Sequence, residues 1–379
     1  MADSISKLTK SVHTGSPGDP QYKGVVNPIY PSAAYDYENM PETQYPRYFN
    51  TPNQRAVSQK IAALENGEDG LIFSSGLAAI MTSLFAFLKQ GDHAILQHDL
   101  YGGTFNAVTV EFPRYGIEYT LVDGTKPEEF EKAIRPNTKV IYVETPSNPT
   151  LTITDLKAVA NIAKRHQLIT IIDNTFASPV NQNPIDLGID VVTHSGTKYI
   201  GGHSDLCCGA AVSTAENIRK IWNSAFHFGG SLDAQTCWLV ERSLKTIVLR
   251  VRQQNENALA IAQWLQQQSS VGKVYYPGLP EHPGHAIARE QMPGGFGGML
   301  SFEVKSDPHG FMGRLKLIKR ALSLGGVEST ICSPVKTSHS KMSPEERIKI
   351  NVTDNLVRFS VGIEDAQDLI NDIRQALGG

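Results

Sequence analysis

A carboxylate stands at the end of one short apolar segment of the sequence. The run Leu168–Ile172 is apolar apart from Thr170 and is followed by Asp173, so it predicts a buried strand that ends in a charge. A buried charge needs a partner. A backbone cap or an arginine would serve. So would the protonated ring nitrogen of pyridoxal phosphate (PLP), a cofactor whose ring must stay an electron sink.

A lysine follows a second such segment. Asp190–Thr193 predicts a strand, and the residues after it read His-Ser-Gly-Thr-Lys and end at Lys198. A lysine among the small hydroxyl residues Ser195 and Thr197 is poorly explained as a surface lysine. Its amine can form a Schiff base with an aldehyde cofactor, and the two hydroxyls can donate to a phosphate. The 25 positions between residues 173 and 198 suit two neighbouring strand ends joined by a short crossover.

A third segment is rich in small residues. The apolar run Leu71–Phe73 leads through Ser74–Ala79, which contains Gly76 and Leu77, into a predicted helix. Small residues let backbone N–H groups approach an anion, and a helix N-terminus favours negative charge. The segment predicts a phosphate cradle, although ordinary helix capping uses the same residues. There is no G-x-x-x-x-G-K-[ST] loop, and the glycine-rich run 294–298 is interpreted as a plain loop.

These side chains need a scaffold of alternating strands and helices. Predicted strands cover 70–73, 94–96, 119–122, 139–144, 168–173 and 190–193. Predicted helices cover 54–65 and 78–88, and a third begins after a cap at Thr154 or Asp155. Apolar strands separated by helices favour a mostly parallel sheet covered on both faces. Ligands of such sheets bind beyond the carboxyl ends of the strands.

The two ends of the chain differ from this central part. Residues 1–46 are rich in Pro, Gly, Ser and Tyr, and their prolines forbid long helices, so they predict an extended arm. An arm without its own core needs another surface, such as a second subunit. Residues 236–265 predict one long helix leading into a smaller C-terminal domain. That domain has expected strands at 298–304 and 357–361 and a last helix at 365–377, while 341–349 predicts a solvated helix or loop.

Bulk properties exclude several classes of function. The net charge is −3 over 379 residues, with lysine and arginine scattered, so no nucleic-acid or membrane-surface footprint is present. No apolar run could span a bilayer and no signal peptide is visible, which predicts a cytoplasmic protein. No metal site is expected, because the cysteines have no zinc spacing. They are interpreted as reduced thiols in the packed interior: Cys207, Cys208, Cys237 and Cys332.

Taken in order, the motifs resemble one known family. Asp173 with Ser195-Gly-Thr-Lys198 and Ser75-Gly76-Leu77 is similar to the Cys/Met-metabolism family of fold-type I PLP-dependent enzymes. That family includes cystathionine γ-synthase, cystathionine β- and γ-lyases and methionine γ-lyase. The resemblance covers nearly the whole chain. It takes in five further segments: Tyr45–Arg47, Leu100–Thr104, Glu144–Pro149, Ser323–Ser329 and Leu356–Gly362.

The resemblance implies roles around the cofactor. Lys198 would carry PLP and later move protons, Asp173 would pair with the ring nitrogen, and Tyr101 would stack on the ring and assist catalysis. The phosphate would be bound by four residues of the same subunit and two of a neighbouring subunit: Gly76, Leu77, Ser195 and Thr197, and then Tyr45 and Arg47.

The resemblance also implies how substrate binds. Arg358 would hold the α-carboxylate of an amino acid as a bidentate partner, helped by Asn148 and Ser323. Each of these residues alone would more often be structural. Only their joint occurrence in the order of the family favours the functional interpretation.

For the fold, the resemblance implies an α/β protein of fold-type I. Its mostly parallel seven-stranded sheet would carry helices on both faces, with a smaller α+β C-terminal domain. The expected division is an extended arm at 1–46 that contacts a neighbouring subunit, a large PLP-binding domain at 47–247 and a C-terminal domain at 248–379. The expected assembly is a homotetramer made of two active dimers.

Three positions bear on the reaction. Enzymes of the family that handle cystathionine commonly have Glu where this chain has Leu322, and Arg where it has Asn106; methionine γ-lyases often have Cys where it has Gly103. The apolar Leu322 favours a carbon–sulfur lyase. We expect cystathionine β-lyase-like elimination that gives a thiol, ammonia and a 2-oxo acid.

Four alternatives stay open. Two keep the chemistry of the family: a methionine or cystathionine γ-lyase, and a cystathionine γ-synthase that acts by γ-replacement on an activated homoserine. A non-catalytic PLP-binding regulatory protein is a third, and a plain nucleotide-binding α/β protein is a fourth. The intact set of Lys198, Asp173, Tyr101 and Arg358 argues against the last two.

Overall fold

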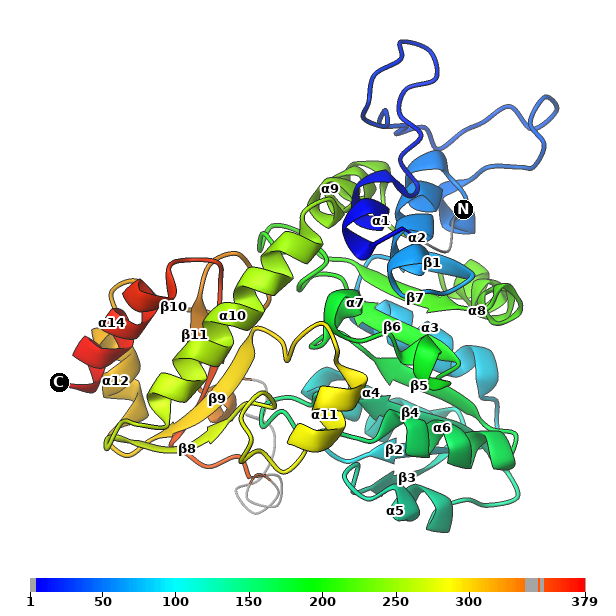
Figure 1. The fold of residues 1–379 in the computed structure, drawn as a ribbon. Coiled ribbons are helices and arrows are strands. Elements are labelled where there is room, and N and C mark those ends of the chain that lie inside the picture. Colours follow the sequence, from blue (N-terminus) through cyan, green and yellow to red (C-terminus); the bar gives the residue numbers. More distant parts are fainter. Residues whose placement is uncertain (1–4, 338–346, 348–350, 379) are drawn as a thin grey trace.

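A mostly parallel sheet forms the centre of the molecule. The computed structural model describes residues 5–337, 347 and 351–378, and within them the larger sheet has seven strands in the order β1-β7-β6-β5-β4-β2-β3 (Figure 1). Only β7 runs antiparallel to its neighbours in this described sheet. The strands are β1 (Asp69–Phe73), β2 (His93–Gln97), β3 (Glu118–Val122), β4 (Thr138–Glu144), β5 (Ile169–Asp173), β6 (Val191–Ser195) and β7 (Gly209–Ser213).

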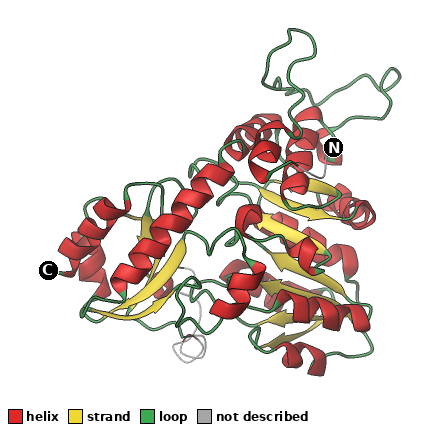
Figure 2. Ribbon diagram, in the orientation of Figure 1, coloured by secondary structure: helices red, strands yellow, loops and turns green. Residues whose placement is uncertain are grey.

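Helices cover both faces of this sheet, as predicted (Figure 2). Because side chains alternate along a strand, Ile171 and Val191 enter one hydrophobic cluster, whereas Ile172 and Val192 enter another. The first cluster packs under α3 (Gly76–Phe87), α4 (Gly102–Arg114) and α8 (Ala215–Phe228). The second packs under α5 (Pro127–Lys132) and α6 (Leu156–Arg165). α2 (Pro52–Leu64) and α7 (Ser178–Asn181) contribute to a third cluster.

The second sheet forms the C-terminal part, with the order β10-β11-β12-β9-β8. Its strands are β8 (Val271–Tyr275), β9 (Met299–Val304), β10 (Lys319–Arg320), β11 (Thr330–Cys332) and β12 (Leu356–Ser360). The helices of this part are α10 (Ile247–Leu265), α11 (His285–Gln291), α12 (Pro308–Arg314) and α14 (Ala366–Leu377). This α+β arrangement agrees with the expected C-terminal domain, while the domain boundaries stay a prediction.

The prediction of one long helix over 236–265 is wrong. The segment forms two helices, α9 (Ala234–Leu244) and α10, which are separated at residues 245 and 246. There the backbone N–H of Thr246 donates a hydrogen bond to the carbonyl oxygen of Ser243, three residues earlier. The Arg250 guanidinium donates to the same oxygen at 2.9 Å. Side-chain capping of that carbonyl ends α9, and the apolar pattern alone could not reveal it.

The N-terminal arm contains a helix that was not predicted. α1 (Lys7–His13) packs on α2 and α10, and the fully buried Lys60 donates from Nζ to the carbonyls of Ser11 (2.9 Å) and Val12 (3.2 Å). From residue 14 to residue 45 the chain follows turns and irregular loops that project from the body in Figure 1, before the 3-10 helix η2 (Pro46–Tyr48). The prediction for 341–349 falls outside the described residues, apart from residue 347.

Three findings concern other expectations. None of the helices in the described part of the chain has both the length and the apolar character needed to cross a membrane. Over the same residues, no cluster of His, Cys, Asp and Glu is large enough to hold a metal ion. All four cysteines are free thiols, but Cys207 is exposed, which corrects the prediction that all four are interior. It lies in the irregular segment between β6 and β7.

Candidate active site

One cavity of about 660 Å³ collects most of the predicted site residues. It lies where the carboxyl ends of β1, β4, β5 and β6 face β12, as expected for an open α/β sheet. Ten of the predicted residues line it: Gly76, Leu77, Tyr101, Asn148, Asp173, Ser195, Thr197, Lys198, Ser323 and Arg358. Residues that are up to 282 positions apart in the sequence, from Gly76 to Arg358, therefore share one wall.

Asp173 is a buried carboxylate at the end of β5. One of its oxygens accepts the backbone N–H of Thr175 at 3.0 Å and also the hydroxyl of Thr175. Burial raises the pKa of Asp173, while those bonds and the charges of His194 and Lys198 act in the opposite direction. No lysine or arginine in the described part of the chain lies within ion-pair distance of it. The cavity therefore presents an anionic group that can accept a cationic N–H.

Lys198 reaches the same cavity from the turn after β6. Its Nζ donates to Ser323 Oγ at 2.9 Å. Burial lowers the pKa of Lys198 and the charge of Arg358 lowers it further, whereas Cys207 and Asp173 raise it. A lowered pKa leaves more of the amine neutral, which is the form that attacks an aldehyde.

The start of α3 has the features of an anion cradle. Ser75 caps the helix, its Oγ accepting the N–H of Ala78 at 3.1 Å, while the N–H groups of Gly76 and Leu77 have no partner within the described residues. A Cβ on Gly76 would stand 2.6 Å from Ser195 Cβ, so only glycine lets the helix start approach the turn after β6. Two unpaired donors thus lie beside the Ser195 and Thr197 side chains, which suits a phosphate.

Arg358 projects from β12 and is buried. Its Nη1 donates to Asn148 Oδ1 at 2.9 Å and its Nη2 to the Ser323 carbonyl at 3.2 Å. Both partners are neutral, and no carboxylate in the described ranges forms an ion pair with this guanidinium. The group is oriented but not neutralised, which is what binding a carboxylate requires.

Tyr101 lies at the mouth of the cavity, with 46% of its surface exposed. It is the cap residue of α4, and its backbone N–H donates to Glu144 Oε2 at 2.7 Å. A Cβ at position 103 would overlap the Tyr101 ring, so Gly103 gives that ring its place beside the helix start.

Tyr45 and Arg47 are the two predicted site residues that the cavity of their own chain does not include. Arg47 donates to the Phe226 carbonyl at 2.6 Å, and its guanidinium lies over the Phe226 ring at 4.7 Å. Both residues are exposed. The Arg47 guanidinium is therefore a surface cation at the end of the arm, held in place by Phe226.

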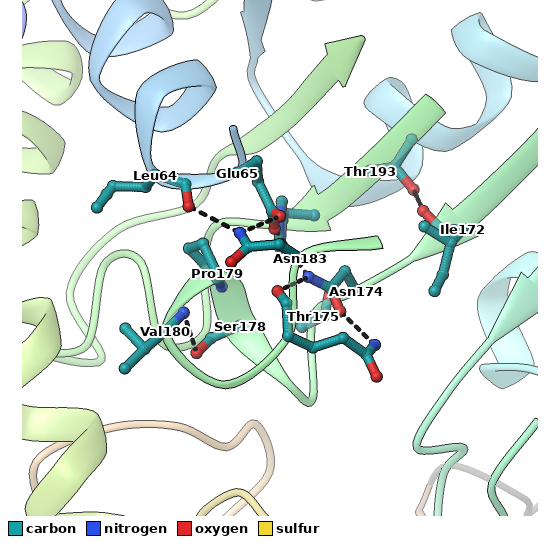
Figure 3. Close-up of polar contacts among 12 residues, drawn as sticks. Leu64, Glu65, Ile172, Asn174, Thr175, Ser178, Pro179, Val180, Asn183 and Thr193 are labelled. Atoms are coloured by element: carbon teal, nitrogen blue, oxygen red, sulfur yellow. Dashed lines mark hydrogen bonds and ion pairs between the residues drawn. The ribbon is translucent and has the colours of Figure 1, made fainter. Parts of the chain in front are cut away.

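Sequence reasoning missed several residues around the cavity. Glu144 and Thr175 line it. Glu144 directly follows an apolar run and Thr175 stands two residues after Asp173, so the rule that identified Asp173 could have found them. Glu65, the residue after α2, is fully buried. Its Oε1 accepts hydrogen bonds from Nε2 of His194 at 2.6 Å and from Nδ2 of Asn174 at 2.8 Å. Figure 3 shows Glu65 between Asn174 and Asn183. Nothing in the sequence signals Glu65, because it follows an ordinary amphipathic helix.

The charges and donors around the cavity fit one cofactor. PLP has an aldehyde, a ring nitrogen that is protonated when paired with a carboxylate, and a phosphate, and these match Lys198, Asp173 and the start of α3. Fold and site together define a PLP-dependent enzyme of fold-type I. The model of the Cys/Met metabolism PLP-dependent enzyme family matches residues 8–378, and the chain belongs to that family.

Individual relatives agree with this assignment. The chain is 44% identical over 381 residues to the cystathionine γ-lyase of Bacillus subtilis (strain 168), covering 98% of this chain and 99% of the relative. It is 46% identical over 347 residues to the cystathionine β-lyase MetC of the same organism, covering 91% and 86%. The crystal structure of cystathionine γ-lyase from Lactobacillus plantarum complexed with L-serine superposes with a TM-score of 0.94 at 39% identity, covering 98% of each chain.

These comparisons confirm the resemblance inferred from the sequence, the fold-type I architecture and PLP as the cofactor. The protein is therefore an enzyme. The interpretations as a non-catalytic PLP-binding regulator and as a plain nucleotide-binding protein are set aside.

Proposed function

We propose that the protein is a carbon–sulfur lyase that cleaves cystathionine-like substrates by β-elimination. The observation that carries the proposal is the cavity that Lys198, Asp173 and Arg358 share, with Leu322 in its wall. Leu322 is 66% exposed and adds an apolar surface beside Ser323. An apolar wall suits the carbon–sulfur stem of a sulfur amino acid and supplies no group to bind a second polar end.

The residues present fit PLP as follows. Lys198 would hold its aldehyde carbon, and Asp173 would pair with its ring nitrogen. The N–H groups of Gly76 and Leu77, with the hydroxyls of Ser195 and Thr197, would bind its phosphate. Bound PLP supplies an electron sink for the charge left when the substrate loses its Cα proton.

The chain itself orients the substrate and moves the protons. Arg358, steadied by Asn148 and the Ser323 carbonyl, binds the α-carboxylate and thereby fixes the direction of the Cα–H bond. Lys198 Nζ, held near Ser323 Oγ, would remove the Cα proton. Tyr101 protonates the departing thiolate as the Cβ–S bond breaks. The remaining fragment takes up water and leaves as pyruvate and ammonia.

The proposal extends to the assembly. Tyr45 and Arg47 would contribute to the phosphate site of a neighbouring subunit, and two such dimers would form a homotetramer. In support, both residues are exposed, they lie outside the cavity of their own chain, and the arm that carries them projects from the body.

A second candidate is γ-elimination, which the 44% identity to a cystathionine γ-lyase over nearly the whole chain favours. It requires a second proton to be removed, at Cβ, before the carbon–sulfur bond breaks. The same amine could remove it, because Lys198 is the mobile base of the cavity.

A substrate panel with product identification separates these candidates. The holoenzyme is incubated with cystathionine, methionine, cysteine, homocysteine and an activated homoserine with cysteine. Our proposal expects pyruvate and homocysteine from cystathionine, and no product from Lys198→Ala. Release of 2-oxobutyrate and cysteine would favour γ-elimination instead. Formation of cystathionine from the activated homoserine, without 2-oxo acid, would contradict both.

A further inference from the structure

Two buried carboxylates stand side by side at the edge of the cavity. Glu144 ends β4 and pairs in register with Asp173, which ends β5. Both are buried and both line the cavity. Burial, and then the charge of Asp173, raise the pKa of Glu144 well above its usual range. Asp173 is the carboxylate that would pair with the ring nitrogen of PLP, so the burial of Glu144 beside it needs a different explanation.

The contacts of Glu144 supply that explanation. Its Oε2 accepts the backbone N–H of Tyr101 at 2.7 Å, and the backbone N–H of Asn148 also acts on the carboxyl group, where it lowers the pKa of Glu144. Tyr101 belongs to the loop after β2, and Asn148 to the loop after β4. One side chain is therefore hydrogen-bonded to the backbone of one cavity residue and interacts with the backbone of another, and the two come from different loops.

Neighbouring bonds hold Glu144 itself. Its backbone N–H and carbonyl both bond the Gln97 side chain, at 2.9 and 2.8 Å. A second tie joins the same two loops, because Ser147 Oγ donates to Asp99 Oδ2 at 2.6 Å. The backbone of Glu144 is thus anchored to β2 independently of its carboxylate. Loss of the carboxylate would free Tyr101 and Asn148 without detaching the strand.

We propose that Glu144 is a positioning residue that sets where the Tyr101 ring and the Asn148 amide stand in the cavity. Its carboxylate acts through the backbone of these two residues and does not itself touch the reacting atoms. This inference rests on the proposed function, in which Tyr101 lies against the cofactor ring and Asn148 steadies Arg358.

The test is Glu144→Gln in the PLP-loaded enzyme. The amide keeps the size of the side chain but replaces one acceptor oxygen with an NH2 group and carries no charge, so the hydrogen bond from the Tyr101 N–H should weaken or be lost. Hydrogen-exchange mass spectrometry of the peptides that contain Tyr101 and Asn148 should show about tenfold faster exchange in one of them. The circular dichroism of the cofactor absorption band should change, because the ring beside it moves. The kcat should fall about tenfold, the effect of one misplaced hydrogen bond.

Asp372→Asn is the matched control. Asp372 is also buried and accepts the backbone N–H groups of Lys316, Leu317 and Ile318, but it lies in the C-terminal part and does not line the cavity. This variant should lower the melting temperature and leave the cofactor dichroism and kcat unchanged. If Glu144→Gln behaves in the same way, with unaltered exchange at both peptides, Glu144 is only structural and the proposal is wrong.

If Glu144→Gln does not fold, Glu144→Asp provides the same decision. Aspartate keeps a carboxyl group but is one methylene too short to reach the Tyr101 N–H from the same backbone position. Exchange and dichroism require no substrate. They therefore decide the role of Glu144 even if the substrate panel gives no product, and an active enzyme with unchanged exchange would overturn only this inference.

Discussion

Thr175 connects the two residues that we propose hold the aldehyde and the ring nitrogen of the cofactor, Lys198 and Asp173. Its hydroxyl donates to the Asp173 carboxylate and accepts the backbone N–H of Ser195 at 2.8 Å. The end of β5 and the turn that carries Lys198 are thereby joined by a single side chain. A shared hydroxyl of this kind fixes the carboxylate relative to the amine, since neither strand end can shift without breaking one of the bonds.

The Asp173→Asn variant gives the prediction at this scale. An amide cannot pair with a ring N–H as an anion, so activity should fall on the order of a hundredfold. In the cofactor-free protein the same substitution should be favourable, because it removes a buried carboxylate and so raises the stability of the fold at higher pH. Because burial raises the pKa of Asp173 in the folded state, ionisation of this group destabilises the fold as pH rises through its titration. Thermal unfolding of both cofactor-free proteins between pH 4 and 8 measures this effect.

We expect the wild-type protein to lose stability relative to Asp173→Asn as the pH rises over that range. A cofactor-free variant that is less stable than the wild type at every pH would show that the carboxylate contributes to folding through partners other than PLP.

At the scale of elements, the strands that position the site could be predicted because they are buried on both faces and therefore read as apolar runs. Each strand predicted for the large sheet lies within two residues of its observed bounds. β7 was missed, because Gly-Ala-Ala-Val-Ser has little β-propensity and is a strand only through its two neighbours. Glu65 was missed for a related reason, since its role arises from contacts that no local pattern encodes.

Gly76→Ala tests the approach of α3 to the turn after β6. A methyl group at 2.6 Å from Ser195 Cβ must separate the two sides of the phosphate cradle. The dissociation constant of PLP should rise tenfold or more, as measured by fluorescence titration of the cofactor-free enzyme. Gly313→Ala is the control, because a Cβ there meets no atom within 4 Å. Equal PLP affinity in the two variants would contradict the cradle.

Lys60 predicts a pH dependence of stability at the junction of α1 and α2. Burial lowers the pKa of Lys60 from 10.5 to about 8, although Glu241 raises it. The folded state therefore disfavours the charged amine, fully so below about pH 8, and this cost disappears as pH rises to 10.5. Urea unfolding of the wild type and Lys60→Met at pH 7.5 and 10 checks this.

The free energy of unfolding of the wild type should increase relative to Lys60→Met between those two pH values, by up to about 3 kcal/mol. A difference between the two proteins that does not vary with pH would mean that the amine is charged throughout, with its two carbonyl partners sufficient to hold it.

At the scale of the whole molecule, the arm is the feature that a single chain does not explain. Tyr22, Val25 and Tyr37 are each more than 70% exposed on loops that leave the body. Apolar side chains on such loops are stabilised when a second copy covers them. The same loops lead to Tyr45 and Arg47, so covering the arm and completing a phosphate site would be one event.

Mixing two inactive variants tests this sharing of sites. Arg47→Ala lacks the contribution to the neighbouring subunit, and Lys198→Ala lacks the amine of its own cavity. A dimer with one subunit of each kind has one complete site. After unfolding and refolding together at equal amounts, activity should recover to about a quarter of the wild-type value, since half of the dimers are mixed. Activity no greater than the average of the two variants alone would mean that each site is built from one chain.

Gly209, the first residue of β7, pairs with Phe73 on one side and with Ser195 on the other. A Cβ there would overlap the carbonyl oxygen of Ser75, so this one residue sets the spacing between the start of α3 and the turn that carries Lys198. A nascent chain that has left the ribosome only as far as residue 198 already contains the amine, the carboxylate and the phosphate donors, yet it lacks the strand that spaces them. Capture of the vitamin-derived cofactor during biosynthesis must therefore wait until residues 209–213 have been made.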